Sequence, residues 1–74
     1  MSNPFLPHIL KIGPKLIHVA DLADASSAYQ IERDQSGEGS NRFPEGRVAI
    51  GSEHYRISYN GRVWKGGTVV LEAQ

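Results

Sequence analysis

Residues 55–65 show the most regular pattern in the chain, an alternation of apolar and polar side chains around Asn60 and Gly61. Asn-Gly favours a two-residue hairpin loop, because a type I′ turn needs positive φ at both central residues and these types tolerate it. This loop would pair Ile57 with Trp64 and Arg56 with Lys65. The pattern therefore predicts one face that carries Tyr55, Ile57, Tyr59 and Trp64, and an opposite face that carries His54, Arg56, Ser58, Val63 and Lys65.

Further apolar segments extend this hairpin into a meander. Residues 47–50 predict the preceding strand, with Val48 opposite Ile57 and Ile50 opposite Tyr55. Gly66 and Gly67 provide a turn, after which residues 68–71 predict a final strand.

Residues 22–33 predict a helix of about three turns, because residues of high helix propensity dominate them. Asp21 is a favourable N-cap, and Gly37 suits the left-handed position that ends many helices. One side of this helix carries a narrow stripe of mostly small residues, namely Leu22, Ala25, Ser26 and Tyr29. Such a stripe favours close packing against the sheet.

Together these elements predict an α+β fold, an antiparallel meander of three to five strands with one helix on one face, in the order β-α-β-β-β(-β). Residues 15–20 are β-branched and apolar and predict its first strand. Residues 35–46 are rich in glycine and serine and predict a loop, in which Phe43 is an apolar anchor. We expect residues 15–74 to form a single small domain.

Residues 1–14 predict a proline-rich apolar arm rather than a regular element. Its apolar side chains require a surface to cover them, either on the same domain or on a partner. Packing on the same domain is the simpler interpretation. The residues that would contact a partner or a second copy are Phe5, Leu6, Ile9 and Leu10.

Composition limits the classes of protein that fit. A chain of 74 residues buries only about 60% of the surface that its unfolded form exposes, so a second subunit would add stability. The absence of cysteine and of a signal or membrane-spanning segment favours the cytoplasm. The formal net charge of zero argues against a dedicated nonspecific polyanion binder.

Positive charge nevertheless concentrates in the strand-rich half of the chain. The candidate residues for binding nucleic acid or another anion are Arg47, Arg56, Arg62 and Lys65. In the predicted pairing the aromatic side chains occupy the opposite face, which argues against stacking of bases beside these cations. An ordinary solvated sheet face is the alternative interpretation.

Catalytic and metal-binding patterns are weak. His8, His18 and His54 lack the short-range spacing of metal ligands, and no serine lies in a nucleophile motif. We therefore expect no enzyme, no catalytic or metal-ligating residue, no cofactor and no small-molecule substrate.

Three segments resemble small uncharacterised proteins of bacterial plasmids, phages and genomic islands. They are residues 25–29, residues 39–46 and the hairpin Tyr-Arg-Ile-Ser-Tyr-Asn-Gly-Arg-Val-Trp at residues 55–64. The resemblance implies a bacterial cytoplasmic setting and an accessory role, and it assigns no site residues.

The leading hypothesis is a small non-enzymatic module that binds a protein partner or a second copy of itself. The alternative is a nucleic-acid-binding protein that uses the basic face of its sheet. No membrane partner is expected.

Overall fold

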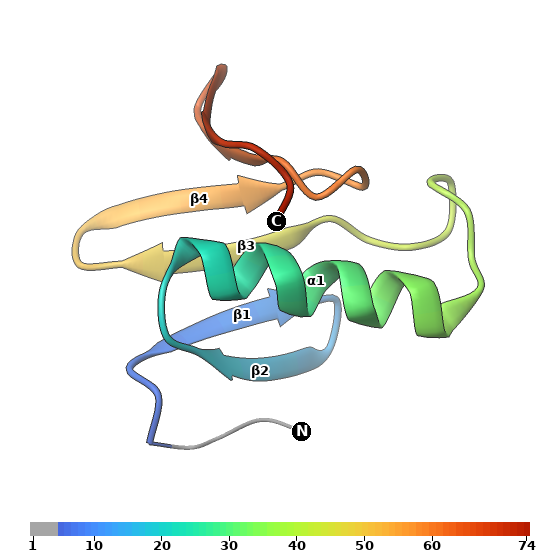
Figure 1. Ribbon diagram of the computed structural model, residues 1–74, viewed down its shortest axis with the longest axis horizontal. Helices are drawn as coiled ribbons and strands as arrows, with labels where there is room; N and C mark the ends of the chain where they lie inside the picture. The colour runs from blue at the N-terminus through green and yellow to red at the C-terminus, as the bar shows by residue number, and fades with distance from the viewer. Residues whose placement is uncertain (1–4) are drawn as a thin grey trace.

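Six antiparallel strands form one sheet, and a single helix lies across one face of it (Figure 1). This computed structural model describes residues 5–74. Across the sheet the strand order is β2-β1-β3-β4-β5-β6. The elements are β1 (His8–Ile12), β2 (Lys15–Val19), α1 (Leu22–Ser36), β3 (Gly46–Ile50), β4 (Glu53–Ile57), β5 (Val63–Lys65) and β6 (Thr68–Leu71). The α+β class and the helix on one face are confirmed. The sheet has six strands instead of the predicted three to five, because β1 precedes the predicted first strand, and the element order is β-β-α-β-β-β-β.

Helix α1 has the two predicted caps. The Asp21 side chain accepts a hydrogen bond from the Asp24 amide at 2.8 Å, and the Asp24 carboxylate accepts one from the Ala20 amide at 2.8 Å. These reciprocal bonds satisfy amides at the helix start. Gly37 ends the helix with a φ of 69°, in the left-handed region.

Strand β1 corrects the prediction of an irregular arm. Residues 8–12 pair with β2 and residues 10–12 also pair with β3, although Pro7 precedes the strand and Gly13-Pro14 follows it. The prolines flank the strand and therefore remove no amide from inside it. The inward side chains of β1 join the core, with Leu10 fully buried and Ile12 nearly so. Residues 1–4 of the predicted arm lie outside the described residues.

The core lies between α1 and the sheet. Its buried apolar members are Leu10, Ile12, Val19, Ala25, Tyr29, Val48, Ile57 and Val63.

Tyr29 is the largest of the fully buried side chains. Its hydroxyl donates to the Pro44 carbonyl at 2.9 Å, and its ring meets the predicted anchor Phe43 edge to face at 5.4 Å. Burial, with a smaller contribution from nearby Glu45, raises the pKa of the Tyr29 hydroxyl to about 12. Tyr29 therefore fastens the loop after α1 to the core in its neutral form.

Ser26 is buried in the same stripe and joins three parts of the chain. Its hydroxyl donates to the Gly61 carbonyl at 2.7 Å and accepts from the Gln74 amide at 3.1 Å. Gln30 donates to the Gln74 carbonyl at 2.8 Å. These bonds hold the β4–β5 loop and residue 74 against α1.

The β3–β4 hairpin is tighter than predicted. Ile50 pairs with Glu53 across Gly51 and Ser52, and Val48 pairs with Tyr55. Gly51 has a φ of 63°, which suits this short turn. The predicted pairing is therefore wrong by two residues. A shift of two leaves every side chain on its predicted face, because the side-chain period of a strand is two.

The predicted pairing of β4 with β5 is wrong by one residue, and this shift changes the fold more than the shift of two residues between β3 and β4. Ile57 pairs with Val63 and Arg56 with Trp64. Asn60 lacks the positive φ that a type I′ turn needs, whereas Gly61 has a φ of 94°. The Gly61 amide donates to the Ser58 carbonyl at 2.8 Å, which fits a three-residue loop with glycine in its last position.

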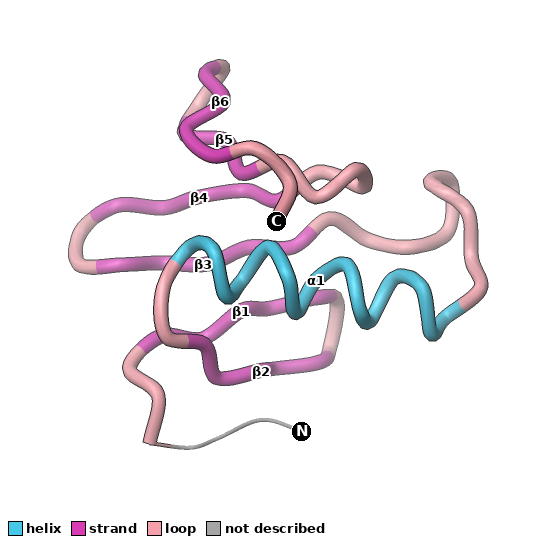
Figure 2. Tube along the Cα trace, viewed as in Figure 1, coloured by secondary structure: helices cyan, strands magenta, loops and turns pink. Residues whose placement is uncertain are grey.

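A one-residue shift moves each side chain of β5 to the other face. Val63 therefore enters the core in place of Trp64, and Trp64 joins Arg56 on the opposite face. Beyond this point a β-bulge at Val63 and Trp64 interrupts the pairing with β6. Figure 2 shows β5 and β6 turning away from the direction of β1–β4.

Within residues 5–74, no helix combines the length and apolar character needed to cross a membrane.

The close contact at Gly46 gives the first prediction. A Cβ atom at this position would lie 2.9 Å from Cδ1 of Tyr29 and 3.0 Å from Cδ1 of Leu10. We expect Gly46→Ala to lower the free energy of unfolding by about 1–3 kcal/mol, because overpacking forces buried groups apart. Urea denaturation measures the change.

Gly39→Ala is the matched control, since a Cβ there meets no heavy atom within 4 Å. Equal unfolding midpoints for the two variants would contradict the packing described for Gly46.

Candidate nucleic-acid interface

The face of the sheet opposite α1 is here called the outer face. Strand alternation places on it Ile9, Lys11, Leu16, His18, Arg47, Ala49, His54, Arg56 and Trp64. None of these side chains is acidic, although the whole chain has as many acidic as basic residues. The outer face is therefore the cationic side of a neutral molecule.

The compensating carboxylates lie mostly on the helical side. Residues 21–38 contain five of the eight acidic side chains and a single cation, Arg33. The fold thus separates charge between its two layers.

Three cations share one row across neighbouring strands. Lys11 of β1 lies opposite Arg47 of β3, and Arg47 lies opposite Arg56 of β4. We call Lys11, Arg47 and Arg56 the cationic row. Directly opposite residues have Cβ atoms only about 5 Å apart, so these like charges repel one another.

Little negative charge reaches the cationic row. Arg56 pairs with Glu45 at 2.7 Å. Within the described residues, neither Lys11 nor Arg47 forms an ion pair. An anion placed along the row would relieve the repulsion.

Trp64 continues the row into β5. It lies opposite Arg56, whose Cζ atom is 5.0 Å from the centre of the indole ring. The indole nitrogen donates to the Ser58 hydroxyl at 3.0 Å. Ser58 in turn donates to the Asn60 side chain at 2.6 Å, so the hairpin loop fixes the orientation of Trp64.

Two of the four predicted cationic site residues, Arg47 and Arg56, come together in this row. Arg62 lies in the β4–β5 loop and pairs with Glu72 at 3.0 Å. The placement of Lys65 on the outer face is wrong, because the one-residue shift turns it toward Glu53, 3.0 Å away. Its hydrogen bond to Glu53 raises the pKa of Lys65.

Lys11 and Trp64 were not predicted as part of this face. The alternation of residues 8–12 between proline-bounded turns was a usable signal for Lys11. The face on which Trp64 lies depends on the length of the β4–β5 loop, which the sequence pattern alone did not determine. Trp64 therefore lies on the same face as the cations, whereas the predicted pairing placed it on the opposite face.

The predicted partner residues are dispersed. Phe5 is 92% exposed, and Ile9 is 44% exposed on the outer face. Leu6 lines a groove, as described below. Leu10 is fully buried in the core, so its predicted role as a partner contact is wrong for this fold.

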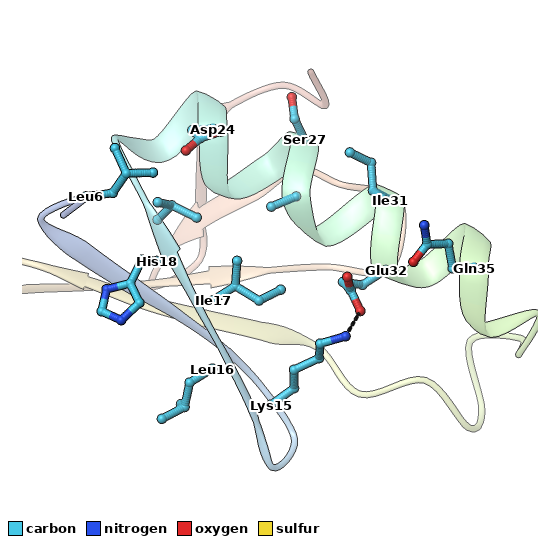
Figure 3. A pocket seen from close by; sticks show the side chains of 12 residues that line it. Leu6, Lys15, Leu16, Ile17, His18, Asp24, Ser27, Ile31, Glu32 and Gln35 are labelled. Carbon is cyan, nitrogen blue, oxygen red and sulfur yellow. Dashed lines mark hydrogen bonds and ion pairs between the residues drawn. The ribbon is translucent and has the colours of Figure 1, made fainter. Parts of the chain in front are cut away.

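The groove has a volume of about 490 Å³ and lies between β2 and α1 (Figure 3). Ile31 lines it from α1 and is 54% exposed, whereas Leu16 lies at its β2 edge with its side chain directed away from α1 (Figure 3). Lys15 pairs with Glu32 at one end, and Asp24 lies near the other (Figure 3). We call this feature the β2–α1 groove.

Within residues 5–74, no three histidine or carboxylate side chains lie close enough together to hold a metal ion.

Comparisons with protein-family models, curated proteins and solved structures found no match to this chain. The resemblance to small proteins of bacterial mobile elements therefore stays a prediction.

Repulsion within the cationic row gives the second prediction. We expect Arg47→Gln to raise the free energy of unfolding at low salt by on the order of a few tenths of a kcal/mol. The substitution removes the positive charge that lies between Lys11 and Arg56 and repels both. The gain should shrink near 1 M salt, where the Debye length falls to about 3 Å. Denaturation at both salt concentrations measures it.

Arg42→Gln is the charge-matched control, since Arg42 is exposed in the loop before β3 and has no ion pair within the described residues. An equal gain in both variants would show that net charge alone, and not the row, determines the effect.

Proposed function

We propose that this chain is a non-enzymatic module that binds nucleic acid through its outer face. The observation that carries the proposal is the pairing of four neighbouring strands, which aligns Lys11, Arg47, Arg56 and Trp64 in one row. Arginine and lysine contact phosphates, and aromatic side chains contact bases. Phosphates spaced along a strand suit a row of cations better than a single small anion does.

The arrangement also favours binding over catalysis. The outer face is open, and its hollows of about 230–290 Å³ are shallow features beside the row. The titratable groups that line these hollows are the three cations of the row together with His54, Tyr55 and Glu45, and none of them lies in a nucleophile motif. Such a surface holds a ligand without enclosing a reacting group.

The third prediction concerns salt and Arg47. Binding of a mixed-sequence oligonucleotide should weaken with salt, with a slope of about −2 in log K against log[salt] if all three cations contact phosphates of a single strand. Arg47→Gln should weaken binding several-fold at low salt and reduce the slope by about 0.7. Trp64 is the only tryptophan, so its fluorescence reports the titration.

Lys15→Gln is the control, because Lys15 has the same charge but pairs with Glu32 on the helical side. If Arg47→Gln and Lys15→Gln have equal effects, the outer face is not the binding site. A variant at Arg47 that is more stable but binds more weakly would identify the row as a site kept at the expense of stability.

A second candidate function is self-association, which the β2–α1 groove favours. Ile31 leaves more than half of its surface exposed beside it. A second copy related by a twofold axis would cover Ile31 and the groove in both subunits at once.

The fourth prediction tests this candidate by sedimentation velocity over a range of concentrations. We expect dimers that Ile31→Ser shifts toward the 8.1 kDa monomer, because the substitution removes an exposed apolar contact. Val70→Ser is the control, since Val70 is also exposed but lies on β6 at the opposite edge. A monomer at every concentration would exclude self-association.

A further inference from the structure

One hollow of the outer face lies directly beside the end of the cationic row. Its volume is about 230 Å³. We call it the Trp64 hollow, and it is lined by Arg47, His54, Tyr55, Arg56, Trp64 and Gly66. An indole, two guanidinium groups and an imidazole therefore surround one shallow depression.

The aromatic group of this hollow is held in place before any ligand arrives. The Ser58 hydroxyl accepts the indole N–H at 3.0 Å, and the Arg56 guanidinium lies over the ring. Arg56 is itself held by Glu45 at 2.7 Å. A preorganised pair loses little side-chain freedom on binding, which favours affinity.

The chemistry of the pair selects the part of a nucleic acid that it can contact. Indole rings and guanidinium planes both stack on the flat faces of bases. In a duplex each base is covered above and below by its neighbours, and only its edges are accessible in the grooves. Only an unpaired base offers a face to such a pair.

We propose that the ligand of the outer face is a single strand, and that one unpaired base stacks on the Arg56–Trp64 pair in the Trp64 hollow while Arg47 contacts an adjacent phosphate. This inference rests on the proposed nucleic-acid binding. It adds the ligand class and assigns separate roles to neighbouring residues. Arg47 supplies charge, Trp64 and Arg56 supply the stacking surface, and Ser58 positions the indole.

The experiment compares three ligands of equal length by fluorescence anisotropy of a labelled strand. They are a mixed-sequence single strand, the same phosphodiester chain with abasic residues throughout, and a duplex. We expect the single strand to bind roughly tenfold more tightly than the abasic chain, a difference within the range of one base stacked on an aromatic side chain. The affinity for the duplex should equal the affinity for the abasic chain once the higher charge density of the duplex is taken into account.

Three variants separate stacking from charge. Trp64→Leu should reduce the affinity for the mixed-sequence strand much more than the affinity for the abasic chain, because the ring also helps to hold Arg56. Arg56→Lys keeps the positive charge but removes the planar group, so the preference should fall while the salt slope is retained. Ser58→Ala should loosen the indole, which lowers the fluorescence anisotropy of Trp64 and reduces only the preference for bases.

Ser52→Ala, in the exposed β3–β4 turn, is the control for Ser58→Ala. Arg56→Lys and Ser58→Ala leave Trp64 in place, so they test the inference even if Trp64→Leu fails to fold.

The failures of the two proposals are distinguishable. Equal, salt-dependent affinity for the single strand and the abasic chain would overturn stacking and leave nucleic-acid binding intact. Absence of salt-dependent binding to all three ligands would overturn the proposed function and this inference with it.

Discussion

The three-residue loop between β4 and β5 determines which face of the sheet each side chain of β5 occupies. Side chains alternate along a strand, so one additional residue in a loop exchanges the two faces of the strand that follows it. Here the exchange places Val63 under α1 and Trp64 beside Arg56. A compact aliphatic side chain suits the limited space of a small core, whereas the indole needs a partner for its N–H group, which Ser58 provides.

Close packing of the helix on the sheet depends on a few small residues. Ala25 and Ser26 on α1 and Gly46 on β3 leave room for Tyr29 between the layers. The buried Ser26 hydroxyl is not a defect in this core, because its bonds to residues 61 and 74 replace those it would make with water. Helix, loop and the last residue of the chain therefore share one hydrogen-bonded junction.

Local rules sufficed for the helix, because its caps depend on residues within a few positions of each end. Strand β1 was not predicted, although Pro7 and Pro14 lie outside it and the residues between them alternate between the two faces. The β4–β5 pairing depends on contacts distant in sequence. Gly61 lies against Gln30 of α1, and its carbonyl accepts from Ser26. The predicted faces of Arg47 and Arg56 are confirmed, because they depend only on the side-chain period of two. The predicted faces of Trp64 and Lys65 are wrong, because they depend on the length of the β4–β5 loop.

The separation of charge between the two layers affects how the molecule is oriented when it approaches a charged partner. A neutral molecule with a cationic sheet and an acidic helix is an electric dipole. A distant polyanion exerts little net force on it but does exert a torque, which turns the sheet toward the negative charge before contact. At physiological ionic strength this alignment operates within about 8 Å, the Debye length, so it orients the last step of an encounter without accelerating the long approach.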